Sequence, residues 1–458
     1  MDAVEFGTDG WRATLDVFTT PRVRAVAQAT ADHLAEAGRG GEPVAVGYDA
    51  RPTSREFAEA IADVLAANGH DVLLPERDCP TPLTAYAIVD RDLAGALVVT
   101  ASHNPPEYNG VKFIPDDGAP ALPHVTESIE ANLRAPPADP DAARGEIREV
   151  DFAPAHFAHA RELVDADLEG LDVVYDAMHG SGRGFTDALL ESAGATVERH
   201  RCERSDDFGG TPPEPDEANL QALALAVQEH DADIGIANDG DADRIAIVTP
   251  ERGFLDENLF FAATYDYLLE DDSGPAVRTV STTFLIDRIA DAHDEEVYET
   301  AVGFKWVAEE MGARDALFAG EESGGFSVRG HIREKDGVLM ALLASAAAAE
   351  ESYDDRVDRI LETYGEVHQS KVSIACPDDR KAAVLDELAD ALPESVAGVA
   401  VERVNDADGF KALFADGSWL LVRASGTEPK MRVYAEADSE SRVAELLEAG
   451  RDLVEPLV

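Results

Sequence analysis

The segment 100–106 contains the residue types of a nucleophilic site: a serine, a histidine and an asparagine, followed by two prolines. It directly follows the apolar run 96–99, which predicts a strand. Such a cluster is also typical of an ordinary turn, but the two prolines favour a fixed loop at the strand's carboxyl end, where open α/β sheets place their chemistry. Ser102 is therefore the candidate nucleophile, with His103 beside it and Lys112 close along the chain.

Three carboxylates at alternate positions, Asp239, Asp241 and Asp243, form a second candidate site between two predicted strands. They can converge on one hard cation through oxygen, and three protein ligands leave positions on Mg2+ open for a phosphate oxygen. Similar spacing opens a calcium-binding helix-loop-helix, but the sixth position here is Arg244 instead of glycine, and the twelfth is Pro250 instead of glutamate. In a chain this acidic, a chance surface run is the alternative interpretation.

Two further segments, 320–325 and 423–432, are rich in groups that bind hydroxyls and phosphates. The first has two glutamates and a serine between glycines. The second combines hydroxyls, loop N–H groups and guanidinium donors, which is what holding a phosphate dianion requires. Because Ser-Gly-Thr turns are common, the second signal is weak by itself.

The elements that must position these segments follow a pattern that recurs three times: an apolar strand, an amphipathic helix and another strand, at 44–74, 171–197 and 277–298. This alternation predicts βαβ units with parallel pairing. The C-terminal region instead predicts an α+β unit with antiparallel strands. Its expected strands are 372–375, 419–423 and 431–435, and its expected helices are 379–392 and 440–454.

The length of 458 residues exceeds one ordinary hydrophobic core and predicts three or four domains. Composition places the junctions in the Pro/Ala/Asp-rich stretch 136–144, in the turn 250–253 and after Tyr364.

The formal net charge is -54, and the basic residues comprise 31 Arg and only seven Lys. A surface this acidic repels nucleic acid and anionic membranes, so we expect neither as a partner. The acidic residues are spread along the whole chain, which favours a general adaptation over a local binding patch. We interpret it as halophilic, because molar salt shortens the screening length to about 3 Å and removes the self-repulsion.

The longest apolar run, 338–349, is too short to span a bilayer. The first residues lack the basic start and apolar stretch of a secretory signal, so we expect a cytoplasmic protein. The three cysteines, Cys79, Cys202 and Cys376, lie far apart without paired spacing. They support neither a disulfide framework nor a zinc site.

Taken together and in order, five segments resemble the α-D-phosphohexomutase family of phosphoglucomutases and phosphomannomutases: Phe6 to Arg12 and the loops at Ser102, Asp239, Glu321 and Arg423. The resemblance spans the whole chain. It implies four domains around a central cleft, three topologically similar α/β domains with mixed sheets and a C-terminal α+β domain. On this sequence they are 1–148 with the phosphoserine loop, 149–252 with the metal-binding loop, 253–366 with the sugar-recognition loop and 367–458 with the phosphate-binding loop.

The resemblance also implies roles for the first two candidate sites. Ser102 would be the phosphoserine, and Asp239, Asp241 and Asp243 would hold Mg2+ together with a phosphoserine oxygen. Arg244 would lie against the phosphoserine.

Further roles follow from the resemblance in the same way. Arg12 and Lys112 correspond to residues proposed as general acid and base, and His103 lies beside the nucleophile. The substrate-binding residues would be Glu321 and Ser323 at sugar hydroxyls, Lys305 facing the substrate, and Arg423, Ser425, Gly426, Thr427 and Arg432 at the non-transferred phosphate.

The implied activity interconverts hexose 1-phosphate and hexose 6-phosphate through a phosphoserine and a bound hexose 1,6-bisphosphate, which is also the expected activator. The segment 302–306 and Gly325 are more like phosphoglucomutases, so glucose is the expected sugar, with phosphomannomutase or phosphoglucosamine mutase as alternatives. A serine-dependent phosphatase and a non-catalytic acidic protein that binds cations or phosphosugars also stay open. The expected partner is a small sugar phosphate, and the expected state is a monomer or small homo-oligomer.

Overall fold

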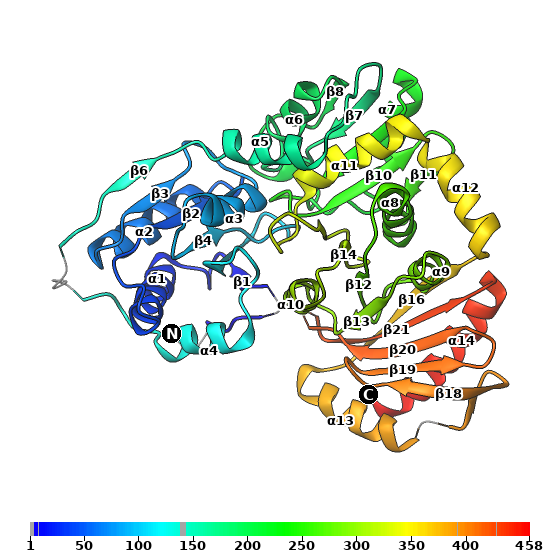
Figure 1. Cartoon of the computed structure of the whole chain (residues 1–458). Helices are drawn as coiled ribbons and strands as arrows, with labels where there is room; N and C mark the ends of the chain where they lie inside the picture. The colour runs from blue at the N-terminus through cyan, green and yellow to red at the C-terminus, as the bar shows by residue number, and fades with distance from the viewer. Residues whose placement is uncertain (1–3, 8, 138–142, 392, 427) are drawn as a thin grey trace.

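The computed structural model describes residues 4–7, 9–137, 143–391, 393–426 and 428–458. Its strands form four main sheets, one after another along the chain, with helices packed on each (Figure 1). The predicted architecture of three α/β units followed by an α+β unit is confirmed. The three predicted strand-helix-strand units are present with parallel strands, as β2-α2-β3, β7-α6-β8 and β12-α9-β13.

The first sheet is mixed, with the strand order β1-β5-β4-β2-β3-β6. Strand β5 runs antiparallel to β1 and β4, and the other pairs are parallel. All residues of β2 and β4 are buried, as expected for central strands covered on both faces. The elements are β1 (Trp11–Thr14), α1 (Thr20–Glu36), β2 (Val44–Tyr48), α2 (Ser54–Ala67), β3 (Val72–Leu74), α3 (Thr81–Asp90), β4 (Gly95–Val99), β5 (Tyr108–Pro115), α4 (Pro123–Ala131) and β6 (Ile147–Glu149).

The second sheet has the order β11-β10-β9-β7-β8, in which β9, β7 and β8 are parallel and the other pairs antiparallel. Because β11 pairs with β10, we propose that the second domain extends to Leu255, beyond the boundary expected at 252. The elements are α5 (Ala153–Leu163), β7 (Asp172–Asp176), α6 (Thr186–Ser192), β8 (Thr196–His200), α7 (Gln221–His230), β9 (Ile234–Asn238), β10 (Ile245–Thr249) and β11 (Gly253–Leu255).

The third sheet has the order β13-β12-β14-β15 and is antiparallel only between β14 and β15. Helix α11, yellow in Figure 1, leaves this unit and packs on α6, β9 and β10 of the second. It is buried from Gly337 to Ala347, which explains its continuous apolar run. The elements are α8 (Glu257–Asp271), β12 (Ala276–Thr279), α9 (Leu285–Ala292), β13 (Val297–Thr300), α10 (Phe304–Arg314), β14 (Phe318–Gly320), β15 (Phe326–Val328), α11 (Gly337–Glu350) and α12 (Tyr353–Tyr364).

The fourth sheet is antiparallel throughout, with the order β16-β21-β20-β19-β18-β17. Helix α14 packs on β16 and β21. The elements are β16 (His368–Ala375), α13 (Asp378–Ala391), β17 (Ser395–Val396), β18 (Val399–Asn405), β19 (Phe410–Phe414), β20 (Trp419–Ala424), β21 (Lys430–Ala437) and α14 (Glu440–Val454).

The hydrophobic cores divide the molecule differently from the sheets. One continuous core joins the first three units and includes Ile88, Leu189, Phe261 and Met340. The fourth unit has its own core and meets the third through a small cluster around Trp419. Within the described residues, no helix combines the length and apolar character needed to cross a membrane. The three cysteines are free thiols.

All four chemistry-bearing segments occupy the same kind of place in their sheets. Each connects two neighbouring antiparallel strands: β4 to β5 at Ser102, β9 to β10 at Asp239, β14 to β15 at Glu321, and β20 to β21 at Ser425. The fold thus presents one short loop per unit for the site.

Candidate active site

Ser102 lies at the start of the β4–β5 loop with its side-chain oxygen against the second unit. Its Oγ donates a hydrogen bond to Asp239 Oδ2 at 2.6 Å, across 137 positions of sequence. Its backbone has a φ of 50°, and its N–H donates to Thr100 Oγ1 at 2.8 Å. Ser102 is only 1% exposed, so the loop holds the hydroxyl in one place, shielded from water.

Arg51 fixes this loop, and no motif in the sequence points to it. The guanidinium is 1% exposed and bonds Asp49 through Nε at 3.0 Å. Its other nitrogens donate to four carbonyl oxygens of the loop, those of Ser102, Asn104, Pro105 and Tyr108, at 2.8, 2.6, 2.7 and 3.1 Å. One buried cation therefore satisfies most of the loop's inward-facing carbonyls, which would be costly to leave unpaired.

The β9–β10 loop brings Asp239, Asp241 and Asp243 together with no exposed surface. One oxygen from each lies within 4.8 Å of the others. Burial raises the pKa of Asp239, and the charges of Asp241 and Asp243 raise it further. A Cβ on Gly240 would lie 2.5 Å from the Ser102 carbonyl oxygen, so only glycine allows the two loops this close.

Two buried lysines face these carboxylates. Lys112 Nζ lies 3.1 Å from Asp243 Oδ2, 3.6 Å from Asp241 Oδ2 and 3.4 Å from Asp9 Oδ2. Lys335 Nζ lies 3.1 Å from Asp243 Oδ2 and 3.4 Å from Asp9 Oδ2. Burial alone would lower both lysine pKa values, but the surrounding carboxylates raise them, so both side chains stay charged at neutral pH.

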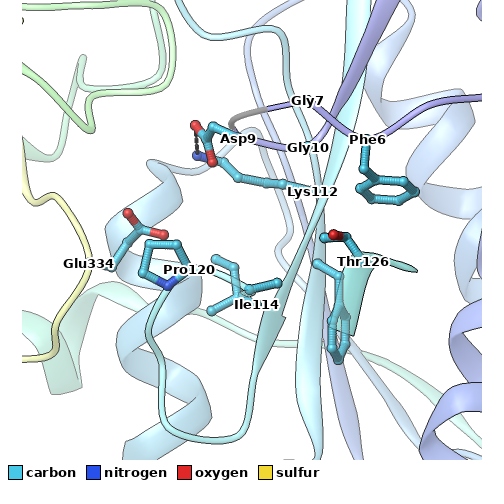
Figure 2. A pocket seen from close by; sticks show the side chains of 11 residues that line it. Phe6, Gly7, Asp9, Gly10, Lys112, Ile114, Pro120, Thr126 and Glu334 are labelled. Atoms are coloured by element: carbon cyan, nitrogen blue, oxygen red, sulfur yellow. Dashed lines mark hydrogen bonds and ion pairs between the residues drawn. The ribbon is translucent and has the colours of Figure 1, made fainter. Parts of the chain in front are cut away.

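A pocket beside this cluster is lined by the N-terminal segment, β5 and α4. In Figure 2 Asp9 and Lys112 pair at its edge, and Glu334 faces them from the third unit. Burial raises the pKa of Glu334 to about 7. Sequence reasoning did not select Asp9, Glu334 or Lys335 as site residues. The scarcity of lysine is the one sequence signal that draws attention to Lys335, because the chain has only seven lysines and this one falls beside the Glu321 segment.

Arg12, His103 and Arg244, predicted near the nucleophile, all lie there. Arg12 donates to Asn104 Oδ1 at 3.3 Å and to Asp9 Oδ2 at 3.1 Å. His103 Nδ1 is 3.3 Å from Ser102 Oγ, and the charge of Arg244, with burial, lowers the pKa of His103 to about 2. The imidazole is therefore neutral at physiological pH.

The Glu321 loop reaches the metal-loop region through the backbone. Ile245 N–H donates to the Gly324 carbonyl at 2.9 Å, and Glu321 Oε1 accepts from Gly303 N–H at 2.8 Å. Lys305 is half-buried, with Nζ 5.6 Å from the Trp306 ring centroid. Ser323 is also partly exposed.

The Arg423 loop is tied to the third unit and not to Ser102. Arg423 Nε donates to Asp408 Oδ2 at 2.8 Å, and the same oxygen accepts from Val302 N–H at 3.2 Å. Ser425 is buried and Gly426 exposed, and Arg432 pairs with Glu428 at 2.8 Å. Thr427 lies outside the described residues. No hydrogen bond among the described residues joins this loop to the cluster around Ser102.

Four consecutive stretches of the chain match the domains of phosphoglucomutase/phosphomannomutase proteins. Residues 3–138 match alpha/beta/alpha domain I, 154–253 domain II, 256–364 domain III and 372–453 the C-terminal domain. A Thermococcus kodakarensis protein named phosphoglucomutase/phosphomannomutase is 32% identical over 98% of this chain and 98% of its own. A Methanopyrus kandleri protein named "Probable phosphoglucosamine mutase" is 32% identical over 98% of this chain and 97% of its own. A solved structure from Thermus thermophilus shares 32% identity over 99% of both chains, with a TM-score of 0.85.

Proposed function

Because the chain belongs to the phosphoglucomutase/phosphomannomutase family, and is thus an isomerase that moves a phosphoryl group within its substrate, we propose that it interconverts glucose 1-phosphate and glucose 6-phosphate. The observation that carries the proposal is the 2.6 Å contact between Ser102 Oγ and Asp239. It joins the only serine of the β4–β5 loop to a buried carboxylate cluster on another unit.

In the proposed first half-reaction, phosphorylated Ser102 passes its phosphoryl group to the free hydroxyl of a hexose monophosphate. The serine O–P bond breaks and a sugar O–P bond forms, while the proposed general base takes the proton of the sugar hydroxyl and the proposed general acid gives a proton to Ser102 Oγ, which leaves a bound hexose 1,6-bisphosphate. The bisphosphate then turns over, and its other phosphoryl group returns to Ser102. Lys112, whose Nζ lies 3.1 Å from Asp243 Oδ2, can donate to phosphoryl oxygens, and Arg12 and Lys112 stay the proposed general acid and base.

The residues present fit a divalent cation. Asp239, Asp241 and Asp243 offer oxygen ligands, and within the described residues Oδ1 of both Asp241 and Asp243 is buried without a hydrogen-bond partner. Three like charges at such short range need a counter-charge beyond the two lysines. Mg2+ held there, with Ser102 or its phosphate as a further ligand, would neutralise charge on the phosphoryl oxygens.

The phosphate that is not reacting would be held by the β20–β21 loop. Its proposed ligands are Arg423, Ser425, Gly426, Thr427 and Arg432, with Glu321, Ser323 and Lys305 at the sugar. Asp408 supports this assignment, because it orients Arg423 while it binds the backbone beside the sugar-facing segment.

The preferred hexose rests on the third unit. A Cβ on Gly325 would lie 2.4 Å from Lys335 Cδ, so the glycine leaves room for the lysine that reaches the carboxylates. We propose that this arrangement serves glucose phosphates. The names of the relatives support phosphomannomutase and phosphoglucosamine mutase activity equally well, so these stay the alternatives.

Coupled assays with glucose 1-phosphate, mannose 1-phosphate and glucosamine 1-phosphate, run side by side with glucose 1,6-bisphosphate and Mg2+, test the proposal. We expect the highest kcat/KM for glucose. Selectivity over mannose should be about tenfold, because the two sugars differ by one uncharged hydrogen bond at C2. A preference for another hexose beyond that factor contradicts the choice of glucose. Net release of inorganic phosphate would instead identify a phosphatase.

A further inference from the structure

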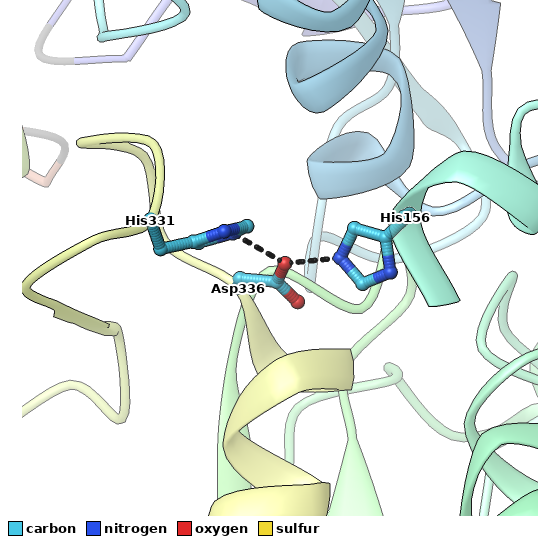
Figure 3. Close-up of side chains that lie close together, drawn as sticks. All are labelled: His156, His331 and Asp336. Atoms are coloured by element: carbon cyan, nitrogen blue, oxygen red, sulfur yellow. Dashed lines mark hydrogen bonds and ion pairs between the residues drawn. The ribbon is translucent and has the colours of Figure 1, made fainter. Parts of the chain in front are cut away.

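A second cluster of buried titratable side chains lies outside the phosphoryl-transfer centre. His156 Nε2 is 2.6 Å and His331 Nε2 is 2.9 Å from Asp336 Oδ2, and both histidines and the aspartate have no exposed side-chain surface (Figure 3). A third histidine, His159, places its Nε2 3.0 Å from His331 Nδ1.

The cluster stands where the first three units meet. His156 and His159 come from α5, His331 and Asp336 from the segment before α11, and Tyr86 from α3 of the first unit. The Tyr86 ring stacks on His159 with centroids 4.7 Å apart and meets His156 edge-on at 5.7 Å. No motif in the sequence singles out any of these residues.

Three ligand-type side chains this close could hold a metal ion. However, the atoms that would bind a metal, Nε2 of His156 and His331 and Oδ2 of Asp336, already form hydrogen bonds with one another. Asp336 Oδ2 accepts from both His156 and His331, and its Oδ1 accepts the Leu339 N–H, which caps α11. With His159 and His331 neutral and carrying their protons on Nε2, every contact in the chain from His159 to His331 to Asp336 pairs a donor with an acceptor. Burial lowers the pKa of His331 and of His159, in agreement with the neutral forms.

Asp336 also adjoins the catalytic cluster. Its neighbour Lys335 reaches Asp243 and Asp9, as described above. Its other neighbour, Gly337, donates its N–H to the Ala242 carbonyl at 3.1 Å, inside the metal-binding loop. A Cβ on Gly337 would lie 2.3 Å from the Arg244 carbonyl oxygen, so the segment is pressed directly against that loop. A shift of Asp336 would therefore move Lys335 relative to the carboxylates.

We propose that His156 and His331 are positioning residues of this enzyme. Their hydrogen bonds to Asp336 from two sides hold the neighbouring Lys335 next to Asp243 and Asp9. In this way they couple the second unit to the catalytic centre. The inference rests on the proposed function for what Lys335 serves. The hydrogen-bond arrangement itself does not depend on that function.

The test compares His156→Gln with His156→Asn. Glutamine can place an N–H where Nε2 stood, whereas asparagine is one methylene too short to reach Asp336. We expect His156→Asn to lower kcat about tenfold or more with KM within about threefold, because displacement of a positioned group acts on the transfer step. His156→Gln should stay within about threefold of wild type in both constants.

His33→Ala is the control, because it removes one half-buried histidine hydrogen bond, from Nδ1 to Ser128 Oγ at 2.9 Å, and leaves no polar group that could replace it. It should lower the melting temperature but leave kcat unchanged. The proposal fails if His156→Asn lowers kcat no more than His33→Ala, or if the Gln and Asn variants of His156 have the same kcat.

A second readout needs no activity. Nitrogen-15 NMR of labelled histidine in the wild-type protein at pH 7.5 should show His159 and His331 neutral with the proton on Nε2, and His156 with a proton on Nε2. A His156 without a proton on Nε2, or stoichiometric zinc that is lost in His156→Asn, would overturn the assignment. Wild-type protein inactive on every hexose phosphate would contradict the proposed function instead, and the NMR result would still test the cluster.

Discussion

Arg51 positions the proposed nucleophile, Ser102, through carbonyl oxygens of its loop and not through the serine hydroxyl. Five hydrogen bonds from one buried guanidinium fix the turn that gives Ser102 its positive φ. Asp49 in turn accepts from Thr100 Oγ1 at 2.8 Å, and Thr100 Oγ1 accepts the Ser102 N–H. The position of the Ser102 oxygen thus depends on a residue 51 positions away in sequence.

Replacing Arg51 by Lys should therefore impair catalysis although it keeps the charge. A lysine cannot reach the four carbonyls together, so we expect a loss of about 1 to 3 kcal/mol in the free energy of unfolding. We also expect kcat to fall at least about tenfold, because Ser102 is no longer held in one geometry. Urea unfolding and steady-state kinetics measure the two effects. Wild-type kcat in a destabilised Arg51→Lys protein would show that the loop holds its shape without this residue.

The three aspartates lead to a prediction about the metal. In wild-type protein, Mg2+ should raise the melting temperature and exhaustive chelation should abolish activity, because the cation binds the folded state and relieves carboxylate repulsion. In Asp241→Asn, which preserves the side-chain shape, we expect Mg2+ to leave the melting temperature unchanged and activity to drop more than about a hundredfold. The variant without metal should melt no lower than metal-free wild type. Full activity after chelation would refute the metal assignment.

The residues that the sequence identified are those with a signature in one short segment. Ser102 follows a strand and precedes two prolines, and Asp239, Asp241 and Asp243 alternate along one loop. Asp9, Arg51 and Lys335 could not be identified in this way, because each acquires its role only when the chain returns to the site from another element. The spacing of residues within one short segment does not show which distant residues the fold brings to it.

At the scale of elements, the strand-helix-strand repeats were predictable because apolar runs and amphipathic helices alternate at regular lengths. The strands that close the Asp239 and Arg423 loops were also predicted, but those that close the Ser102 and Glu321 loops were not. Strands β5 and β15 pair with a neighbour only in the folded sheet, and that pairing turns each of these two motifs into a tight connection. Helix α11 was likewise visible only as an apolar run, with no indication that it packs on the second unit.

The absence of a side chain at Gly325 leaves space for the side chain of Lys335, and replacing this glycine tests whether that space matters. In Gly325→Ala the new methyl group would meet the flexible stem of Lys335 at 2.4 Å, so the lysine can move aside at little cost to the fold. We expect the free energy of unfolding to change by less than about 1 kcal/mol, but kcat to fall several-fold as Lys335 leaves the carboxylates. The Gly40→Ala variant serves as the control for glycine replacement itself, because Gly40 lies outside the left-handed region like Gly325 and its Cβ would come no closer than 3.3 Å to another atom, Ala35 Cα. An unchanged kcat in Gly325→Ala would remove Lys335 from the proposed mechanism.

At the scale of the molecule, the first three units share one core, whereas the fourth joins the third through a small apolar cluster around Trp419 and several polar contacts. Lys411, Asn405 and Asp408 of the fourth unit bond Glu299 and the Val302 backbone of the third. Polar interfaces of this kind permit relative motion between domains. The arrangement suits the role proposed for the β20–β21 loop, which is to hold either end of a bisphosphate in turn.

The charge of the whole surface makes a separate prediction. The net charge is -54, and Lys371 alone among the lysines is exposed, so carboxylates and arginines make up nearly all of the charged surface. In about 0.01 M salt these charges interact over roughly 30 Å, whereas molar salt screens them. We expect the melting temperature to be at least about 5 °C lower in 0.01 M than in 2 M KCl. Equal melting temperatures across this range would contradict the high-salt interpretation.

The central claim is that Ser102 carries the phosphoryl group between the two ends of the sugar. Its most direct test is incubation of the protein with glucose 1,6-bisphosphate that carries phosphorus-32, followed by peptide mapping and a chase with unlabelled glucose 1-phosphate. We expect label on the Ser102 peptide alone, then its transfer to hexose phosphates without release of inorganic phosphate, and no label in Ser102→Ala. Label on another residue, or its loss to water as inorganic phosphate during the chase, would contradict the claim.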